Sequence, residues 1–125
     1  MMNSVTGLQH IGIPSNQLEE SIRFYTTLGF DTVHRPIYES EVIFMQLSNL
    51  IIELYEADKV AGKVGAINHI ALNCENITEA YQHISSLGIP TIEGEIKSLP
   101  YWENGVRFFS IMGPNSEIIE FCQRL

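Results

Sequence analysis

Residues 116–122 read Ser-Glu-Ile-Ile-Glu-Phe-Cys, a short apolar run with a carboxylate, Glu120, near its centre. Branched and aromatic residues in such a run are typical of a β-strand. A second stretch, residues 50–55, reads Leu-Ile-Ile-Glu-Leu-Tyr and holds Glu53 in a similar place. Removing an unpaired carboxylate from water is costly, so a Glu inside an apolar strand is normally paired, protonated or bound to a metal. We therefore interpret the two strands as halves of one candidate site.

The chain around these two strands repeats one order of elements. A strand at 8–13 precedes a helix that ends at Gly29, and a strand at 67–72 precedes a helix that ends at Gly88. The same number of residues separates Gly29 from Gly88 as separates His10 from His69. Glu53 and Glu120 lie further apart, so the second copy carries additional residues, which the loop at 97–105 accommodates most naturally. A repeat of this kind indicates a duplicated structural unit.

Each copy is predicted to be a strand, a helix and three further strands. In the first copy the later strands are expected at about 30–37, 41–47 and 50–55, with a turn at Ser48-Asn49. In the second copy they are expected at about 89–96, 106–111 and 117–122, with an irregular loop or hairpin at 97–105. The predicted class is α+β: two tandem βαβββ modules, at about 6–56 and 66–123, form one curved mixed sheet or cup. With the connector 57–65 they make a single domain, residues 1–125.

The two helices are predicted to begin at capping side chains that satisfy exposed backbone N–H groups. Ser15 or Asn16 is expected to cap the first, and Asn76 or Thr78 the second. Pro14 is expected to end the strand before the first helix. Helical spacing predicts two inner faces, which consist of Leu18, Ser21, Ile22, Tyr25 and Leu28 in one helix and Ile77, Ala80, Tyr81, Ile84 and Leu87 in the other.

Alternation along the strands predicts which face each candidate side chain occupies. In the strand 50–55 the apolar neighbours of Glu53 are expected to face the helix, which puts Glu53 on the opposite face. The same reasoning places Glu120, His10 and His69 on the face that carries no helix. If that face curves into a cup, the four side chains converge there.

Two neutral imidazoles and two carboxylates suit a divalent transition metal, foremost Ni²⁺ or Zn²⁺, with Co²⁺, Mn²⁺ and Fe²⁺ as alternatives. The predicted metal ligands are His10, Glu53, His69 and Glu120. Such an ion would leave positions for water or substrate oxygens and act as a Lewis acid. It would stabilise an enediolate of a small hydroxycarbonyl substrate, while a ligand Glu that detaches from the ion moves a proton between neighbouring carbons.

Simpler interpretations exist for each residue alone. A lone His or Glu in a strand is more often a core, edge or surface residue than a ligand. The metal site is favoured because both residue types recur at matching places in the duplicated unit. The loop around Tyr101 and Trp102 is a candidate lid over a substrate, or else a surface hairpin or a dimer contact. His34 and His83 are assigned no role.

Composition narrows the classes of partner. The formal net charge is −8, and the seven Lys and Arg residues form no basic run, which argues against nucleic acid and anionic membranes. No apolar run approaches the length of a membrane helix, and the N-terminus resembles no signal peptide, so the cytoplasm is the expected location. Cys74 and Cys122 form no CxxC motif and are expected to be buried thiols, with no disulfide between them.

Several motifs resemble the vicinal oxygen chelate superfamily, the glyoxalase/bleomycin-resistance/dioxygenase fold, over about residues 8–123. The similarity rests on His10–Ile13, Phe24-Tyr25 before Leu28-Gly29-Phe30, Ile52-Glu53-Leu54, His69–Leu72, and Gly113–Ser116 leading to Ile119-Glu120-Phe121. The resemblance implies paired βαβββ modules around a metal. The His, Glu, His, Glu set is most similar to glyoxalase I (lactoylglutathione lyase). This similarity implies that His10, Glu53, His69 and Glu120 are metal ligands and that Glu120, with Glu53, forms the catalytic pair that shuttles the substrate proton.

The resemblance leaves other activities open. Glyoxalase I usually has an Arg and an Asn that grip glutathione where this chain has Pro14 and Ala57, so the similarity does not extend to glutathione use. One alternative is a metal-free protein that binds a drug or metabolite, and another is an Fe²⁺-dependent extradiol dioxygenase. Neither alternative needs Glu53. The resemblance also implies a homodimer, whose sites lie within one chain or are built from two chains, and a small-molecule substrate.

Overall fold

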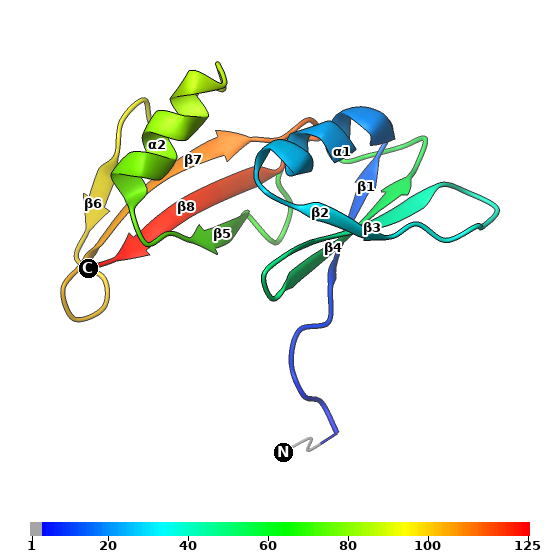
Figure 1. The fold of residues 1–125 in the computed structure, drawn as a ribbon, viewed down its shortest axis with the longest axis horizontal. Coiled ribbons are helices and arrows are strands. Elements are labelled where there is room, and N and C mark those ends of the chain that lie inside the picture. Colours follow the sequence, from blue (N-terminus) through cyan, green and yellow to red (C-terminus); the bar gives the residue numbers. More distant parts are fainter. Residues whose placement is uncertain (1–3) are drawn as a thin grey trace. The chain divides into compact units, whose positions relative to one another are not determined.

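The computed structural model describes residues 4–125 and divides the chain into two compact units, with the boundary between Val60 and Ala61. This boundary falls inside the predicted connector 57–65. Each unit contains one four-stranded sheet and one helix that lies across a face of that sheet (Figure 1). The prediction that the N-terminus forms no signal peptide includes Met1–Asn3, and these three residues lie outside the described part of the chain. Neither helix described between residues 4 and 125 is long and apolar enough to cross a membrane.

The first unit has the order β1 (Ile11–Ser15), α1 (Leu18–Thr27), β2 (Asp31–His34), β3 (Val42–Leu47) and β4 (Leu50–Glu56). Its strands lie side by side as β1-β4-β3-β2. β1 runs parallel to β4, whereas β4, β3 and β2 form an antiparallel meander. The turn between β3 and β4 is the predicted one, and Ser48 adopts a φ of 54° in it.

The second unit repeats this arrangement with β5 (His69–Asn73), α2 (Ile77–Ser86), β6 (Lys97–Leu99), β7 (Val106–Met112) and β8 (Ile118–Arg124). The strand order β5-β8-β7-β6 is the counterpart of the first sheet, with β5 parallel to β8. The predicted α+β class and the duplicated βαβββ order are therefore confirmed.

Each unit has its own apolar core between the helix and the sheet. Along β4 the buried Ile52 and Leu54 alternate with partly exposed neighbours, and along β8 the buried Ile119 and Phe121 do the same. This alternation is the period-two pattern predicted from the sequence. The other buried apolar side chains are Ile13, Leu18, Tyr25, Phe30, Ile43 and Met45 in the first unit and Ile77, Ile84, Val106, Phe109 and Ile111 in the second.

The helix ends agree with the predictions better than the helix starts do. Asn76 caps α2, and its side-chain oxygen accepts a hydrogen bond from the Glu79 N–H at 3.0 Å. Gly29 and Gly88 follow the two helices with φ of 100° and 75°, a conformation that favours glycine. The predicted cap of α1 is wrong, because the N-cap residue is Gln17 and its side chain makes no capping bond.

Ser15 supports the start of α1 in a different way. Its buried hydroxyl accepts a hydrogen bond from the Gln17 N–H at 3.0 Å and lies 2.9 Å from the Ser21 hydroxyl. Pro14 does not end β1 as predicted. β1 is an edge strand that pairs only with β4, so it can hold a residue without an N–H and continue to Ser15.

Replacing Ser15 with Ala is expected to lower the free energy of unfolding by about 1–3 kcal/mol, because a buried acceptor is lost beside polar groups. Urea unfolding followed by circular dichroism measures this change. The matched control is Ser40→Ala at an exposed position of the same unit, where the change should stay within about 0.5 kcal/mol. Equal effects of the two substitutions would show that the buried hydroxyl contributes nothing.

Two predictions for the second unit are wrong. Residues 89–96 contain no strand, and the edge strand β6 starts later, at Lys97. Beside β7, the Glu93 carboxylate accepts the Ser110 N–H at 2.6 Å, and the Ile92 N–H donates to the Ser110 carbonyl at 2.8 Å. A side chain thus replaces part of a regular ladder. Leu87, predicted on the inner face of α2, lies beyond the helix end and is 44% exposed.

The predicted loop 97–105 consists of β6 and the segment 100–105. The Arg124 guanidinium lies 4.0 Å from the centre of the Trp102 ring, and the Leu125 N–H donates to the Gly105 carbonyl at 3.0 Å. Tyr101 and Trp102 are both exposed. These contacts hold the loop against the end of β8, while its role as a lid stays a prediction.

Candidate metal-binding residues

In the first unit the strand pairing brings His10 and Glu53 together. Gly12 of β1 pairs with Glu53 of β4, and His10 lies two residues before Gly12, on the same face. The Nε2 atom of His10 lies 3.7 Å from a carboxylate oxygen of Glu53. Ile52 and Leu54, which flank Glu53, are buried toward α1, so the pair lies on the face without a helix.

The second unit builds the same pair from corresponding positions. Ala71 of β5 pairs with Glu120 of β8, and His69 lies two residues before Ala71. The distance between His69 Nε2 and the Glu120 carboxylate is again 3.7 Å. The Glu120 side chain is 20% exposed and the Glu53 side chain is 29% exposed. The sequence suggested buried carboxylates, whereas both keep some contact with water. Both remain accessible to an ion and a substrate.

The distance within each pair fits a shared ion better than a hydrogen bond. At 3.7 Å the nitrogen and oxygen are too far apart for a hydrogen bond, which needs about 2.7–3.2 Å. Two ligands of one ion at about 2.0–2.2 Å lie roughly 2.8–3.6 Å from each other in octahedral or tetrahedral geometry. A small closure of either pair would therefore let one divalent ion contact both atoms.

The four predicted ligands lie in the structure as two pairs, one in each unit. Among residues 4–125, no group of three or more His, Cys, Asp and Glu side chains is close enough to hold a metal by itself. The four-residue metal site therefore stays a prediction, and the within-unit pairs are its structural basis.

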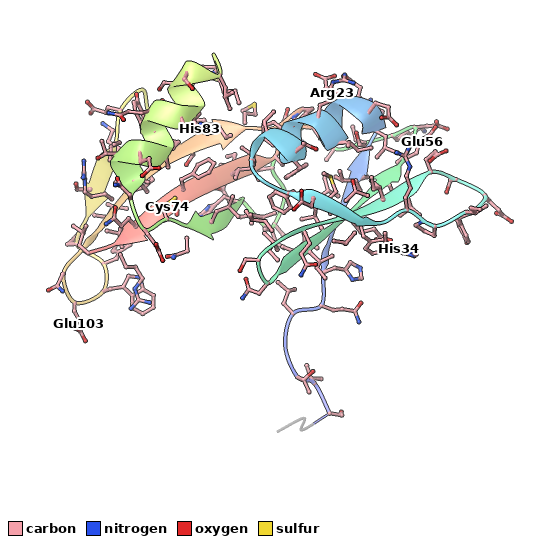
Figure 2. All side chains as sticks on the ribbon, in the orientation of Figure 1. Arg23, His34, Glu56, Cys74, His83 and Glu103 are labelled. Carbon is pink, nitrogen blue, oxygen red and sulfur yellow. The ribbon has the colours of Figure 1, made fainter. Side chains whose placement is uncertain are left out.

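Two further aromatic side chains share the helix-free face of the first unit, and sequence analysis gave neither a role. Phe44 pairs with Glu53 across β3 and β4, and its ring lies edge-on to His10 at 5.8 Å between centres. His34 pairs with Phe44, with ring centres also 5.8 Å apart. In Figure 2, His34 lies on the side of β2 and β3 away from α1.

A β-bulge explains why strand alternation did not reveal His34. The pairing register of β2 shifts between Thr32 and His34, so His34, instead of Val33, lies opposite Phe44. Bulges often re-aim a side chain beside a functional site. No pattern in the sequence marks this irregularity, and only the pairing register reveals it.

Both cysteines are free thiols, and each is only partly buried, less than the sequence predicted. Burial raises the pKa of the Cys74 and Cys122 thiols, and the negative charge of Glu120 raises that of Cys122 further. Both thiols are therefore protonated at neutral pH in the metal-free protein.

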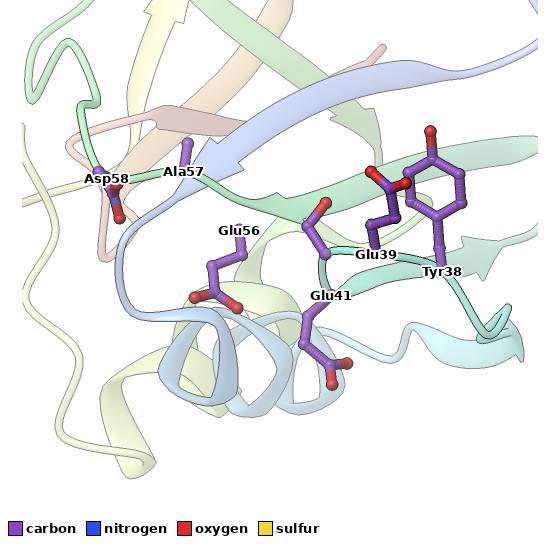
Figure 3. A pocket seen from close by; sticks show the side chains of 7 residues that line it. Tyr38, Glu39, Glu41, Glu56, Ala57 and Asp58 are labelled. Atoms are coloured by element: carbon purple, nitrogen blue, oxygen red, sulfur yellow. The ribbon is translucent and has the colours of Figure 1, made fainter.

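An acidic hollow of about 330 Å³ lies elsewhere in the first unit (Figure 3). Its lining includes the carboxylates of Glu39, Glu41, Glu56 and Asp58. One of them is already paired, because Arg35 donates a hydrogen bond to Glu41 at 3.3 Å and another to Glu19 at 3.0 Å. The hollow concentrates negative charge but includes none of the four predicted ligands.

Comparison with known proteins shows similarity to one superfamily over most of the chain. A family model of the Glyoxalase/Bleomycin resistance protein/Dioxygenase superfamily matches residues 7–110. The Bacillus subtilis (strain 168) protein YwbC is 32% identical over 94% of this chain and 97% of its own length. A bleomycin resistance protein of Geobacillus stearothermophilus is 29% identical over 90% of this chain and 93% of its own.

Solved structures share the fold. The genomically encoded fosfomycin resistance protein FosX of Listeria monocytogenes has a TM-score of 0.77 at 18% identity, and the match covers 97% of this chain and 95% of that chain. FosX has also been solved in complex with Mn(II) and a sulfate ion. At this identity the similarity establishes the fold alone.

Proposed function

Because the chain belongs to the glyoxalase/bleomycin resistance protein/dioxygenase superfamily, we propose that it is a metal-dependent, glyoxalase I-like lyase or isomerase. Its substrate would be a small hydroxycarbonyl compound or a hemithioacetal. The observation that carries the proposal is the duplicated His–Glu pair, His10 with Glu53 and His69 with Glu120, at 3.7 Å in both units. A pair that recurs at corresponding strand positions is far more specific than either pair alone.

The four side chains of the two pairs would hold one divalent ion, Ni²⁺ or Zn²⁺ foremost. Two imidazoles and two carboxylates are donors that such ions accept, and Co²⁺, Mn²⁺ and Fe²⁺ also fit. FosX with Mn(II) supports the choice of a divalent ion on this fold. When bound, the ion would supply Lewis acidity that lowers the energy of negative charge on substrate oxygens.

The proton transfer would fall to the carboxylates. Glu120 is the less exposed of the two, at 20% against 29% for Glu53, and its neighbours on the same face of β8, Ile118 and Cys122, are partly buried. We assign to Glu120 the removal of a proton from a substrate carbon, which gives an enediolate. Return of a proton to the neighbouring carbon, by Glu120 or Glu53, and transfer of the substrate's hydroxyl proton to its former carbonyl oxygen complete the isomerisation.

Glutathione is not required by this proposal. Pro14 lies in β1 opposite Tyr55, and Ala57 follows the end of β4. Neither side chain can donate a hydrogen bond to a peptide carboxylate. Pro14 and Ala57 therefore favour a substrate that contains no glutathione and that is bound through its own oxygen atoms.

A second candidate function is a metal-free protein that binds a drug or metabolite. Relatives 29% identical to this chain and named bleomycin resistance proteins favour it. This function requires no metal, so metal content separates it from the first. An Fe²⁺-dependent dioxygenase is the remaining alternative, and it would consume oxygen in the presence of catechols.

A test of the proposed reaction uses protein purified without chelator and then loaded with Ni²⁺ or Zn²⁺. We expect isomerisation of small hydroxycarbonyl compounds, assayed beside the hemithioacetal of methylglyoxal and glutathione, and no oxygen uptake with catechols after Fe²⁺ loading. Chelator-treated protein is the control and should be inactive. A protein that binds bleomycin but no metal would contradict the proposed lyase or isomerase activity and favour the metal-free binding function. Oxygen uptake with catechols would favour the dioxygenase.

We also propose that the protein works as a homodimer, in the cytoplasm, on a small molecule, with no nucleic-acid or membrane partner. In a dimer, each metal site would use the two pairs of one chain or one pair from each of two chains. Light scattering measures the oligomeric state directly. A monomer that still binds one ion per chain would show that the site needs no second chain.

A further inference from the structure

Each candidate histidine is preceded by a residue with a side-chain amide. Gln9 precedes His10, and Asn68 precedes His69. The amide oxygen of Gln9 lies 2.9 Å from Nδ1 of His10, and that of Asn68 lies 3.0 Å from Nδ1 of His69. The same contact therefore occurs in both units, on the ring nitrogen opposite to the one that faces the carboxylate.

This contact decides where the neutral imidazole carries its hydrogen. A carbonyl oxygen can only accept, so a hydrogen bond of 2.9–3.0 Å requires the hydrogen to be on Nδ1. A neutral ring then has its lone pair on Nε2, which is the atom 3.7 Å from the carboxylate. At that distance no hydrogen bond from Nε2 to the carboxylate competes with the contact between Nδ1 and the amide oxygen.

The sequence Gln-His alone does not produce the contact. Gln82-His83 in α2 repeats the dipeptide, yet the described part of the chain has no hydrogen bond between these two side chains. Consecutive side chains on a helix point about 100° apart, which keeps the two groups from meeting. The contact therefore belongs to the backbone geometry at the start of β1 and β5, and His83 is an internal control.

We propose that Gln9 and Asn68 are positioning residues that hold His10 and His69 in the Nδ1–H tautomer, with the Nε2 lone pair free toward Glu53 and Glu120. Metal-binding histidines commonly donate their other ring N–H to an oxygen, which fixes the ring orientation and raises its basicity. The consequence for metal affinity rests on the proposed function, whereas the tautomer is a property of the metal-free protein.

The first arm of the test is nitrogen NMR of the metal-free protein, recorded at rising pH until the ring-nitrogen shifts of the histidines no longer change. Long-range ¹H–¹⁵N spectra report which ring nitrogen carries the hydrogen. We expect Nδ1–H for His10 and His69, and the Nε2–H form that free imidazole rings prefer for His83. Nε2–H as the main form of both His10 and His69 would overturn the proposal, whether or not the protein binds metal.

The second arm compares Zn²⁺ affinity among two double variants and one single variant, measured by competition with a chromophoric chelator. Gln9→Leu with Asn68→Leu removes both acceptors and should weaken binding about 10–100-fold. Gln9→Glu with Asn68→Asp keeps an oxygen at each position and should retain the wild-type affinity or exceed it. Gln82→Leu, which alters the Gln that precedes His83 in α2, is the control and should leave the affinity unchanged.

Two results of this arm would overturn the proposal. One is wild-type affinity in the leucine variant, and the other is loss of affinity that the carboxylate variant does not restore, which would show a purely structural role. If the leucine variant does not fold, the NMR result on the wild-type protein decides. A wild-type protein that shows the Nδ1–H tautomer but binds no Zn²⁺ would overturn the proposed metal function while confirming the hydrogen bond.

Discussion

Replacing Glu120 with Gln is expected to weaken binding of Ni²⁺ or Zn²⁺ by more than about 100-fold, because loss of a residue that only orients a ligand already costs about 10–100-fold. The amide keeps the size of the carboxylate but removes its charge, while the partly exposed position on β8 tolerates either group. Any turnover that remains in fully loaded protein should fall by about 10²–10⁴, the usual contribution of a general base.

The matched control for this substitution is Glu75→Gln, which removes the same charge from an exposed residue before α2. Its metal affinity and turnover should equal those of the wild type. Calorimetric titration of both variants with Zn²⁺ gives the comparison. If Glu120→Gln and Glu75→Gln bind Zn²⁺ with the same affinity, Glu120 is not a ligand and its assigned role in catalysis fails with it.

Replacing Phe109 with Ala is expected to lower the free energy of unfolding by about 3–5 kcal/mol, a large part of the about 5–15 kcal/mol that holds a domain together. Phe109 is fully buried in β7. Its ring stacks on Phe121 at 4.9 Å between centres and lies edge-on to Tyr81 at 5.1 Å. The substitution therefore opens a cavity between α2 and the strand that carries Glu120.

Urea unfolding of this variant should be compared with that of Met112→Ala. Met112 lies in the same strand but is 54% exposed, so its loss should cost no more than about 0.5 kcal/mol. The Phe109 variant should also lose metal binding at urea concentrations where the control retains it, because β7 and Phe121 support Glu120 from the buried side. A loss below about 1 kcal/mol for Phe109→Ala would contradict this description of the core.

The duplicated pattern is the reason that most of the fold could be predicted. Gly29 and Gly88 mark helix ends because each needs a positive φ that other residues reach only with strain. Strand alternation placed Ile52 and Ile119 inside because one face of each sheet is covered by a helix. Helix-ending glycines and strand alternation depend on residues close together in the chain, so both can be predicted from the sequence.

The parts that were missed depend on contacts between distant residues. The strand expected at 89–96 does not form there, because the Ser110 N–H donates its hydrogen bond to the Glu93 carboxylate. No local sequence pattern predicts this contact. The start of α1 was assigned to a side-chain cap, whereas the Ser15 hydroxyl lies in a buried pair with Ser21. The bulge that turns His34 toward Phe44 is likewise a property of strand pairing.

The candidate site shows the same division. Strand parity alone predicted that His10 and Glu53 share a face, as do His69 and Glu120, and the structure brings each pair to 3.7 Å. The contacts of Gln9 and Asn68 could not be predicted, because the same Gln-His dipeptide behaves differently on a helix. Metal binding by all four residues stays a prediction, and one measurement tests it directly.

That measurement is the metal content of the chain by mass spectrometry, after loading with Zn²⁺ and removal of excess ion. If both pairs hold one ion together, the wild type should bind about one ion per chain, and His10→Ala and His69→Ala should each reduce it below about one tenth. His83→Ala, which alters a histidine of α2, should leave it unchanged. Two ions per chain, or an unchanged content in either ligand variant, would contradict a single site built from both pairs.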